Sequence, residues 1–252
     1  MAADNAGPMV SVITITYNAA QTLERTIVSV EAQDYKAIEY IIVDGGSTDG
    51  TMQIVGRHER SISRCISEPD DGIYFAMNKG LAAATGEYVW FLNAGDEFHS
   101  PSSVSDAMSA AAGADVVYGD TVVTAADGSV IGGRRLEPPE RLTADSFRDG
   151  MLVCHQAFVP RRSICPPYDT SFRFSADYDW CLKILLKARS VVNARQVLVR
   201  FLDGGFTKSH IAQGLRERFA IMSRQFGLAP TLARHLLIAA RFFRFWIAKG
   251  RF

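Results

Sequence analysis

Four segments before residue 100 run from an apolar stretch of strand length directly into polar or acidic residues, and segments with helical periodicity separate them. They are Val10–Thr16 before Asn18, Tyr40–Val43 before Asp44, residues 64–67 before Asp70 and Asp71, and Tyr88–Leu92 before Asn93 and Asp96. Strands that alternate with helices form right-handed crossovers and a parallel sheet. We therefore predict an α/β fold with a Rossmann-like, mostly parallel central sheet and helices on both faces.

The polar residues that follow the four strands are expected to meet at one edge of the sheet, where open α/β sheets bind ligands. Asp96, which ends Asn93-Ala94-Gly95-Asp96, is therefore a candidate ligand of a hard cation such as Mg2+ or Mn2+. The same four residues also suit a plain turn. The convergence of four polar groups on one edge favours a binding site.

Two common phosphate-binding motifs do not explain this edge. Residues 45–50, Gly-Gly-Ser-Thr-Asp-Gly, do not have the Gly-x-Gly-x-x-Gly spacing, and the chain contains no Gly-x-x-x-x-Gly-Lys-Ser/Thr loop. Asp44, directly before them, would lie unfavourably against a pyrophosphate. It is better suited to accept the N–H of a base, while a cation at Asp96 neutralises a diphosphate. A nucleotide-diphosphate donor requires these groups.

After residue 100 the pattern is looser. We expect helices over 102–112 and from Ser175 to about Ala188, strands over 115–118, 155–159 and 191–202, and a hairpin that joins Thr121–Val123 to Val130–Ile131. Ser175 is a suitable N-cap, and acids in the first turn of its helix interact favourably with the helix dipole. Residues 204–210 are expected to form a polar, flexible loop.

The C-terminal segment differs in charge from the rest of the chain. Residues 211–252 contain eight Lys or Arg and one acid, whereas the whole chain has 27 of each sign. On a helical wheel of residues 232–251, Phe243, Trp246 and other apolar residues share one side and five bases the other. This separation is typical of an interfacial membrane helix, so we expect C-terminal amphipathic helices at the inner face of the cytoplasmic membrane. A helix docked on the protein core or on a partner would show the same stripe.

The motifs at the sheet edge resemble those of the family 2 glycosyltransferases. They are residues 10–18 (VSVITITYN), 42–51 (IVDGGSTDGT), 71–80 (DGIYFAMNKG) and 91–96 (FLNAGD). The resemblance covers roughly residues 9–210, in order and spacing. It implies the GT-A fold, a nucleotide-sugar donor, a divalent cation and inversion at the anomeric carbon. Within the family, the chain is most similar to bacterial enzymes that build extracellular polysaccharide, lipopolysaccharide or glycolipid sugars.

The resemblance also implies roles for individual residues. Thr16 and Asn18 are expected to line the nucleotide pocket, Asp44 to recognise the base, usually uracil, and Asp71, Asn78, Asn93 and Gly95 to frame the nucleotide and the donor sugar. Asp96 matches the metal-binding end of the family's Asp-x-Asp-like motif, which here keeps one carboxylate. His210 is a second candidate metal ligand, His155 and Lys208 are candidate contacts to a phosphate or the acceptor, and Asp120 is a candidate hydrogen-bond partner of the donor sugar. For His155, His210 and Asp120, a purely structural role is an open alternative.

The general base is expected in the second half of the chain. In the family it is an Asp at the start of a helix, and Asp177 in Ser175-Ala176-Asp177-Tyr178-Asp179 matches it, with Ala176 where a Glu is often found. The reaction requires one carboxylate near the acceptor hydroxyl, opposite the departing diphosphate, to take its proton. Asp179 is more easily explained as a helix-start acid.

Length and cysteine content agree with a single intracellular domain. We divide the 252 residues into a flexible tail (1–8), a GT-A domain (9–210, with a nucleotide-binding half to 100 and an acceptor-binding half after it) and the basic helical segment 211–252. The four cysteines lack the spacing of a disulfide framework or zinc site, which fits a reducing compartment. Residues 1–8 are no signal peptide, and no long uncharged apolar run predicts a membrane span. We expect a cytoplasmic protein, peripherally associated with the inner membrane.

The sequence therefore predicts an inverting hexosyltransferase that moves a sugar from a nucleotide-diphosphate sugar, most often a UDP-sugar, to a hydroxyl of a lipid-linked or polysaccharide acceptor, with no nucleic-acid partner. Two alternatives stay open. A nucleotidyltransferase would need a basic glycine-rich loop after the first strand, where Tyr17-Asn18-Ala19-Ala20-Gln21 has no base. A non-catalytic nucleotide-sugar-binding protein would fit the reduced metal motif, although Asp177 argues against it.

Overall fold

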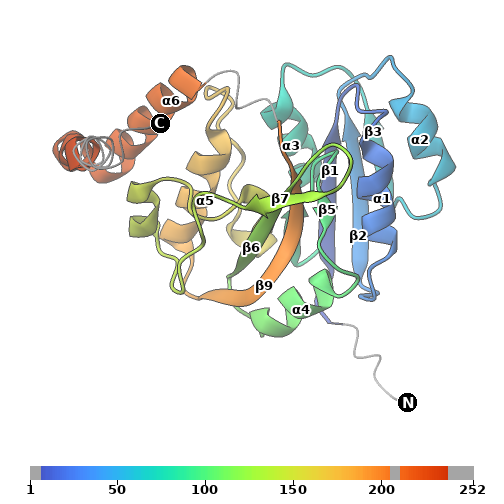
Figure 1. Ribbon diagram of the computed structural model, residues 1–252, viewed down its shortest axis with the longest axis horizontal. Coiled ribbons are helices and arrows are strands. Elements are labelled where there is room, and N and C mark those ends of the chain that lie inside the picture. The colour runs from blue at the N-terminus through green and yellow to red at the C-terminus, as the bar shows by residue number, and fades with distance from the viewer. Residues whose placement is uncertain (1–6, 205–210, 238–252) are drawn as a thin grey trace.

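A four-stranded parallel sheet forms the first half of the protein in a computed structural model that describes residues 7–204 and 211–237 (Figure 1). Its strand order is β3-β2-β1-β4, formed by β1 (Val10–Thr16), β2 (Ile38–Asp44), β3 (Arg64–Ser67) and β4 (Tyr88–Phe91). All three pairings are parallel, and Thr16 and Asp44 are register partners where β1 and β2 end. The predicted strands and their parallel arrangement are confirmed.

Helices cover both faces of this sheet, so its strands are buried on each side. The helices are α1 (Leu23–Glu31), α2 (Thr51–Arg57), α3 (Ile73–Ala83) and α4 (Ser103–Ala111). Apolar residues of α1, α2 and α4 pack with Val12 and Trp90 on one face, whereas Tyr74 and Met77 of α3 pack with Ile13 on the other (Figure 1). The predicted helices on both faces of the sheet are therefore confirmed.

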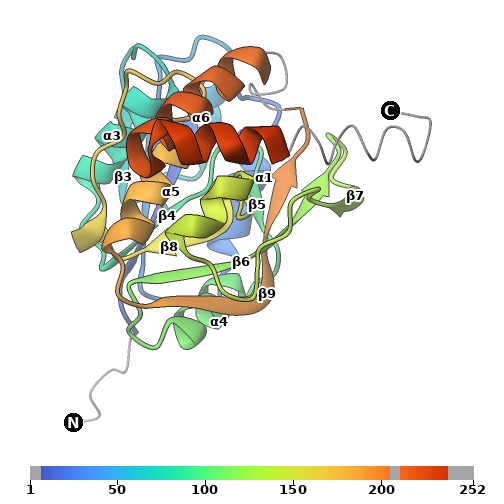
Figure 2. The same ribbon diagram turned by 90° about the vertical axis from the view of Figure 1, so that its left-hand side faces the viewer.

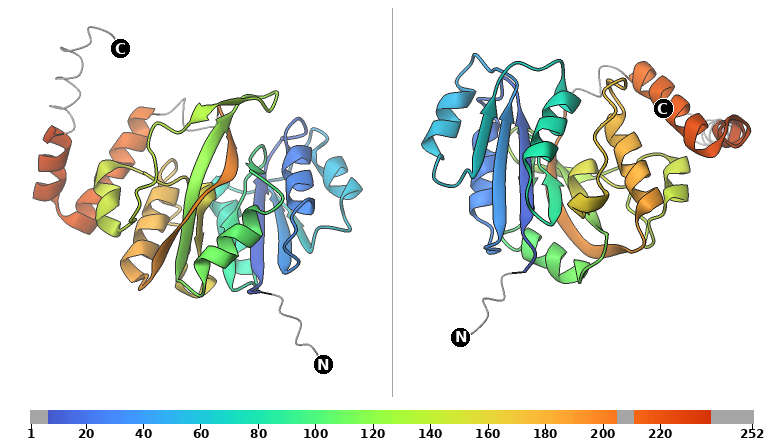
Figure 3. Two further views of the ribbon diagram at one scale, coloured as in Figure 1. Left: turned by 60° about the horizontal axis from the view of Figure 1, so that its bottom comes forward. Right: turned by 180° about the vertical axis from the view of Figure 1, so that it is seen from behind.

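A second, mixed sheet forms most of the second half of the chain. Its order is β5-β9-β6-β7 with β8 paired to β6, and its strands are β5 (Glu97–Phe98), β6 (Val116–Thr124), β7 (Val130–Gly133), β8 (Phe158–Pro160) and β9 (Val191–Leu202). The pair β6–β9 is parallel and the others are antiparallel. The curved β9 lies beside β6 over most of its length (Figure 3). The predicted hairpin exists as β6 and β7.

Two local predictions in this half are wrong. The strands expected at 115–118 and 121–123 are one strand, β6, with irregular pairing around Asp120. The strand expected over 155–159 begins only at Phe158, because His155–Ala157 form a 3-10 turn, η2. This turn lets the Gln156 carbonyl accept the indole N–H of Trp90 at 2.6 Å while its amide points to Asp96.

The remaining helical elements lie beside the second sheet. They are the 3-10 turns η1 (Ala144–Asp149) and η3 (Arg162–Ile164), the helices α5 (Ala176–Lys187) and α6 (Ile211–Phe226), and a helical segment over residues 228–237. The 228–237 segment passes in front of η1 (Figure 2), and Arg234 forms an ion pair with Asp149 there. The predicted amphipathic helix at the membrane also includes residues 238–252, which lie outside the described residues.

Glu217 of α6 connects the C-terminal segment to the start of α5. Its carboxylate accepts three consecutive backbone N–H groups, from Arg173 at 2.9 Å, Phe174 at 2.8 Å and Ser175 at 2.9 Å. The Ser175 hydroxyl in turn donates to the Gly214 carbonyl at 3.1 Å. Hydrogen bonds to an ionised group stabilise more than neutral ones. The single acid of the basic segment therefore fixes the residues directly before Asp177.

Replacing Glu217 with Ala removes the acceptor of three N–H groups, two of which belong to the buried residues Phe174 and Ser175. We expect Glu217→Ala to lower the free energy of unfolding by about 2 to 4 kcal/mol, measured by urea denaturation. Glu59→Ala, at an exposed position after α2, is the matched control and should change it by less than about 0.5 kcal/mol. Equal effects of the two variants would contradict this role of Glu217.

Candidate active site

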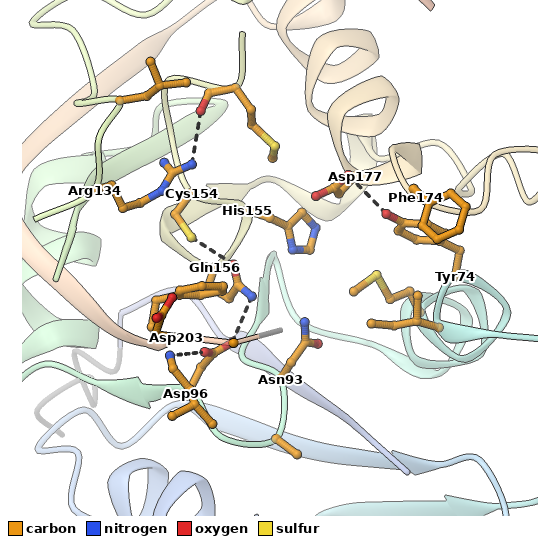
Figure 4. Close-up of a pocket in the computed structure, with 18 of the residues that line it drawn as sticks. Tyr74, Asn93, Asp96, Arg134, Cys154, His155, Gln156, Phe174, Asp177 and Asp203 are labelled. Atoms are coloured by element: carbon orange, nitrogen blue, oxygen red, sulfur yellow. Dashed lines mark hydrogen bonds between the residues drawn. The ribbon is translucent and has the colours of Figure 1, made fainter. Parts of the chain in front are cut away.

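A cavity of about 490 Å³ lies where the end of β4, the turn η2, the end of β9 and the start of α5 converge. Its lining includes Asn93, Asp96, His155 and Asp177, which were all predicted as site residues. Figure 4 shows Asp96 and Asp177 at opposite sides of the cavity, with the His155 ring seen between them. The structure therefore brings the predicted metal ligand and the predicted base to one space, from the two halves of the chain.

Asp96 is buried, with 4% of its surface exposed, and both of its oxygens are engaged. Oδ2 accepts the side-chain amide of Gln156 at 2.9 Å, and Oδ1 accepts the backbone N–H of Leu202 at 3.0 Å (Figure 4). Burial raises the pKa of Asp96 to about 7, because desolvation outweighs these two hydrogen bonds. A cation beside the carboxylate would offset that desolvation.

Asn93 supplies a second oxygen of the kind that a hard cation prefers. Its Oδ1 is buried, has no hydrogen-bond partner in the described part of the chain, and belongs to a residue that lines the same cavity as Asp96. Within residues 7–204 and 211–237, no group of three or more His, Cys, Asp or Glu is placed to hold a metal. Mg2+ is usually held by one or two carboxylates together with substrate phosphates. One carboxylate and one amide oxygen therefore fit a cation whose coordination a bound diphosphate completes.

Gly95 lies between Asn93 and Asp96 in a conformation that suits glycine. Its φ is +101°, and a Cβ there would lie 2.8 Å from Cδ2 of Leu202. Its N–H donates to the Thr26 hydroxyl at 2.9 Å. The turn after β4 is therefore fixed from both sides, with Asn93 and Asp96 held at the cavity.

Asp177 lies in the first turn of α5, where the helix dipole favours a carboxylate. Its Oδ1 accepts the Tyr74 hydroxyl at 3.1 Å and the backbone N–H of Tyr178 at 2.8 Å. No group of the described chain donates to Oδ2. One oxygen is thus anchored, and the other is available to a ligand in the cavity.

The residues predicted to bind the nucleotide lie where β1 and β2 end. Asp44 is fully buried, and its Oδ2 accepts the Gly46 N–H, the Ser47 N–H and the Ser67 hydroxyl, whereas its Oδ1 accepts the Ser47 hydroxyl. Asn18, at φ +47°, accepts the Thr48 N–H through its side chain at 2.9 Å. The two residues fix the loop after β2.

The other predicted residues at this edge differ in burial and in hydrogen bonding. The hydroxyl of Thr16 is buried, has no hydrogen-bond partner among the described residues and is not part of the cavity lining. Asn78 of α3 makes two hydrogen bonds to the backbone of Tyr168, at 3.0 Å and 2.7 Å, so its amide joins the two halves of the protein. Asp71 is exposed beside the start of α3. Asn78 therefore has a clear packing role in addition to any contact to a donor.

The candidate phosphate and sugar contacts differ in their position relative to the cavity: His155 lines it, whereas Asp120 does not. His155 is buried, and its Nε2 lies 2.7 Å from the Tyr168 hydroxyl, while burial lowers its pKa to about 4. It is therefore neutral at physiological pH. Asp120, within β6, accepts the Thr121 N–H at 2.7 Å and is not among the cavity residues. Lys208 and His210 lie outside the described residues.

Several cavity residues had no predicted role. They include Tyr74, which donates to Asp177, Gln156, which donates to Asp96, and Arg134, Arg173 and Arg218. The segment around Gln156 was predicted as a strand, which gave no reason to single out its amide. An exposed Arg before a helix start is ordinary in a sequence, so Arg173 carried no distinct signal either.

The comparisons with known proteins agree with this geometry. Residues 11–165 match the family described as Glycosyl transferase family 2. An uncharacterized glycosyltransferase of Mycobacterium tuberculosis is 32% identical over 252 residues, which covers 95% of each chain. A PGL/p-HBAD biosynthesis glycosyltransferase of Mycobacterium bovis is 29% identical over 231 residues, 87% of each chain.

Solved structures show the same fold at low sequence identity. S. aureus TarS 1-349 in complex with UDP-GlcNAc superposes with a TM-score of 0.70 at 20% identity, over 90% of this chain and 72% of that one. The mannosyltransferase PcManGT from Pyrobaculum calidifontis, in complex with GDP-Man and Mn2+, gives 0.61 at 20% identity, over 94% and 76%. The fold is therefore GT-A, as the sequence predicted. The chain belongs to glycosyl transferase family 2 and is a glycosyltransferase that acts on nucleotide sugars.

Proposed function

We propose that this glycosyltransferase transfers a sugar, with inversion, from a UDP-sugar to a hydroxyl of a lipid-linked or glycan acceptor. The observation that carries the proposal is the shared cavity of Asp96 and Asp177, in which one carboxylate has both oxygens engaged and the other has one oxygen available. The complex of TarS with UDP-GlcNAc supports a uridine donor. The PGL/p-HBAD relative supports a glycolipid acceptor.

Asp177 acts as the general base in this proposal. The Tyr74 hydroxyl and the Tyr178 N–H orient its Oδ1, so that Oδ2 faces the acceptor hydroxyl and takes its proton as the new glycosidic bond forms. The bond from the anomeric carbon to the diphosphate oxygen breaks on the opposite face, and the diphosphate leaves with the electron pair. A base on the face opposite to the leaving group produces inversion.

Asp44, Thr16 and Asn18 form the nucleotide side. Oδ1 of Asp44 accepts only the Ser47 hydroxyl among the described residues, so it keeps a lone pair for the N–H of a base. The unpaired Thr16 hydroxyl is a further polar contact. Asp96 and Asn93 Oδ1 are the residues that would hold Mg2+ or Mn2+. When bound, the cation acts as a Lewis acid that stabilises the leaving diphosphate.

The helical segment 228–237 is proposed to lie on the membrane surface. Leu228, Leu232, Leu236 and Leu237 are exposed by 57%, 46%, 71% and 53%, whereas Arg234 points to Asp149. A helix docked on the core would bury those leucines. None of the described helices is long and apolar enough to cross a membrane. An exposed apolar row beside the basic C-terminal residues suits the surface of an anionic bilayer.

Asp177→Asn removes the proton acceptor and keeps the shape of the side chain. We expect the turnover of a UDP-sugar to fall by at least about a hundredfold, measured as released UDP, with UDP affinity within about twofold of the wild type. Asp34→Asn, the same change at an exposed residue whose side chain makes no hydrogen bond to the described residues, is the matched control and should keep full activity. Loss of UDP binding in Asp177→Asn would place this residue in the nucleotide site instead.

The raised pKa of Asp96 predicts a pH dependence of stability. Between pH 4 and 7, the carboxyl of Asp96 loses its proton in the unfolded protein and keeps it in the folded protein. As pH rises through this range, the free energy of unfolding of the wild type should therefore fall relative to that of Asp96→Asn, by at least about 1 kcal/mol. Above pH 7 the difference should stay constant. Urea denaturation from pH 4 to 8.5 measures the difference.

The metal assignment has its own test. At pH 8, Mn2+ should raise the free energy of unfolding of the wild type and not that of Asp96→Asn, and EDTA should abolish the activity of the wild type. Parallel pH profiles, or activity that survives both EDTA and Asp96→Ala, would refute the assignment.

The membrane proposal predicts that the protein floats with vesicles of phosphatidylglycerol and phosphatidylcholine at low salt and less at high salt. Leu232→Ser combined with Leu236→Ser should abolish flotation and leave the turnover of a water-soluble donor unchanged. Leu186→Ser with Ile131→Ser, at two exposed apolar positions elsewhere, should float as the wild type does. If all three proteins float equally, this leucine row is not the membrane contact.

A further inference from the structure

Two arginines from the segments around Asp177 line the cavity. Arg173 lies in the segment that leads into α5, four residues before Asp177, and Arg218 lies on α6. Within residues 7–204 and 211–237, no carboxylate pairs with either guanidinium, and no acceptor receives a hydrogen bond from Arg173. Two positive charges therefore face the cavity without compensation from that part of the chain.

Glu217 connects the backbone positions of these two arginines. The backbone N–H of Arg173 donates to Oε1 of Glu217, and Glu217 directly precedes Arg218 in α6. The carboxylate of Glu217 is occupied by three backbone donors, so it does not neutralise its neighbour. The guanidinium of Arg218 lies 5.9 Å from the ring centre of Tyr178, next to Asp177. The backbone at both positions is therefore fixed on the side of the cavity where Asp177 lies.

Arg218 also has an unfilled hydrogen-bonding group. Its Nε is buried and has no acceptor in the described chain. A buried donor without a partner is unfavourable, and an oxyanion in the cavity would supply the missing acceptor. Arg134 differs, because it donates to the carbonyl groups of Met151 and Leu152 and so already has acceptors. The available cationic groups are therefore those beside Asp177.

The position of these arginines assigns them to the acceptor and not to the donor. A base that takes the acceptor proton lies on the face opposite to the departing diphosphate, and the diphosphate belongs on the side of Asp96. Arg173 and Arg218 come from the segments around Asp177, so they adjoin the molecule whose hydroxyl Asp177 contacts. Arginine binds phosphate and carboxylate groups through two parallel hydrogen bonds, which neutral sugars do not offer.

We propose that the acceptor carries an anionic group, a phosphate or a carboxylate, close to the hydroxyl that receives the sugar, and that Arg173 and Arg218 bind this group. The proposal rests on the proposed function, because it names the class of acceptor for the same site. It gives the two arginines a role in selecting the acceptor: they favour an acceptor with an oxyanion near its reactive hydroxyl over its neutral analogue.

The test measures binding of three small glycosides to the full chain in the presence of saturating UDP and Mn2+, by calorimetry. The probes are methyl glucoside 6-phosphate, methyl glucuronide and the neutral methyl glucoside. We expect at least one anionic glycoside to bind about tenfold more tightly than the neutral one, and the stronger of the two identifies phosphate or carboxylate. Arg173→Gln combined with Arg218→Gln should remove this preference and leave UDP affinity within about twofold.

Arg57→Gln combined with Arg195→Gln is the matched control, since it removes two arginines that pair with Glu24 and Glu140 at the surface. It should keep the preference. The proposal is overturned if the wild type binds the three glycosides equally or binds none of them. It is also overturned if the preference for an anionic glycoside survives in the Arg173/Arg218 variant. UDP release from a panel of UDP-sugars without acceptor tests the proposed function separately. If the protein turns over a UDP-sugar but shows no preference for anionic glycosides, only the proposed acceptor class is refuted.

Discussion

The buried carboxylate of Asp96 joins the two halves of this protein at the cavity. It lies after the last strand of the parallel sheet, and its two hydrogen bonds come from Gln156 in η2 and from the backbone of Leu202 at the end of β9. The three segments are far apart in sequence. Any change that moves the second sheet therefore alters the surroundings of the carboxylate, and a cation held there would in turn stabilise the contact between the halves.

A second connection acts from the other side of the cavity. Glu217 of α6 fixes the backbone of residues 173–175, and Tyr74 of α3 fixes Asp177 from the nucleotide half. The predicted base is thus held by a helix from the first half and by a helix from the basic C-terminal segment. Because α6 precedes the leucine-rich segment 228–237, contact with a membrane surface would be transmitted to the start of α5 through one carboxylate.

The sequence predicts the parallel sheet well because each of its strands is buried on both faces, and apolar runs such as Val10–Thr16 record that burial directly. It places Asp96, Asn93 and Asp177 correctly at one site because each follows or opens a regular element. Contacts between distant segments leave no such record. Nothing in the residue pattern connects Gln156 to Asp96 or Glu217 to Arg173, and each pair depends on how the second sheet packs on the first.

The errors have the same origin. His155–Ala157 has the composition of a strand, but the tertiary contacts of Gln156 with Trp90 and Asp96 bend it into a turn. Asp120 follows an apolar run as Asp96 does, yet β6 continues through it, because β9 offers backbone partners on both sides of that residue. An acid after an apolar run is therefore evidence for a site only when the strand ends there, and the neighbouring strand decides where it ends.

Asp96 and Asp177 are the same residue type in one cavity, and their surroundings give them opposite chemistry. Desolvation dominates at Asp96, whose pKa rises to about 7, so the ionised form gains most from a metal ion. Asp177 lies in the first turn of a helix, with one oxygen anchored and the other available to a ligand. If Asp96 holds the cation and Asp177 takes the proton, as we propose, then environment, and not residue type, separates the metal ligand from the proton acceptor. Arg173 and Arg218 extend this logic to the acceptor, since two cationic groups at the cavity favour a molecule that brings its own oxyanion.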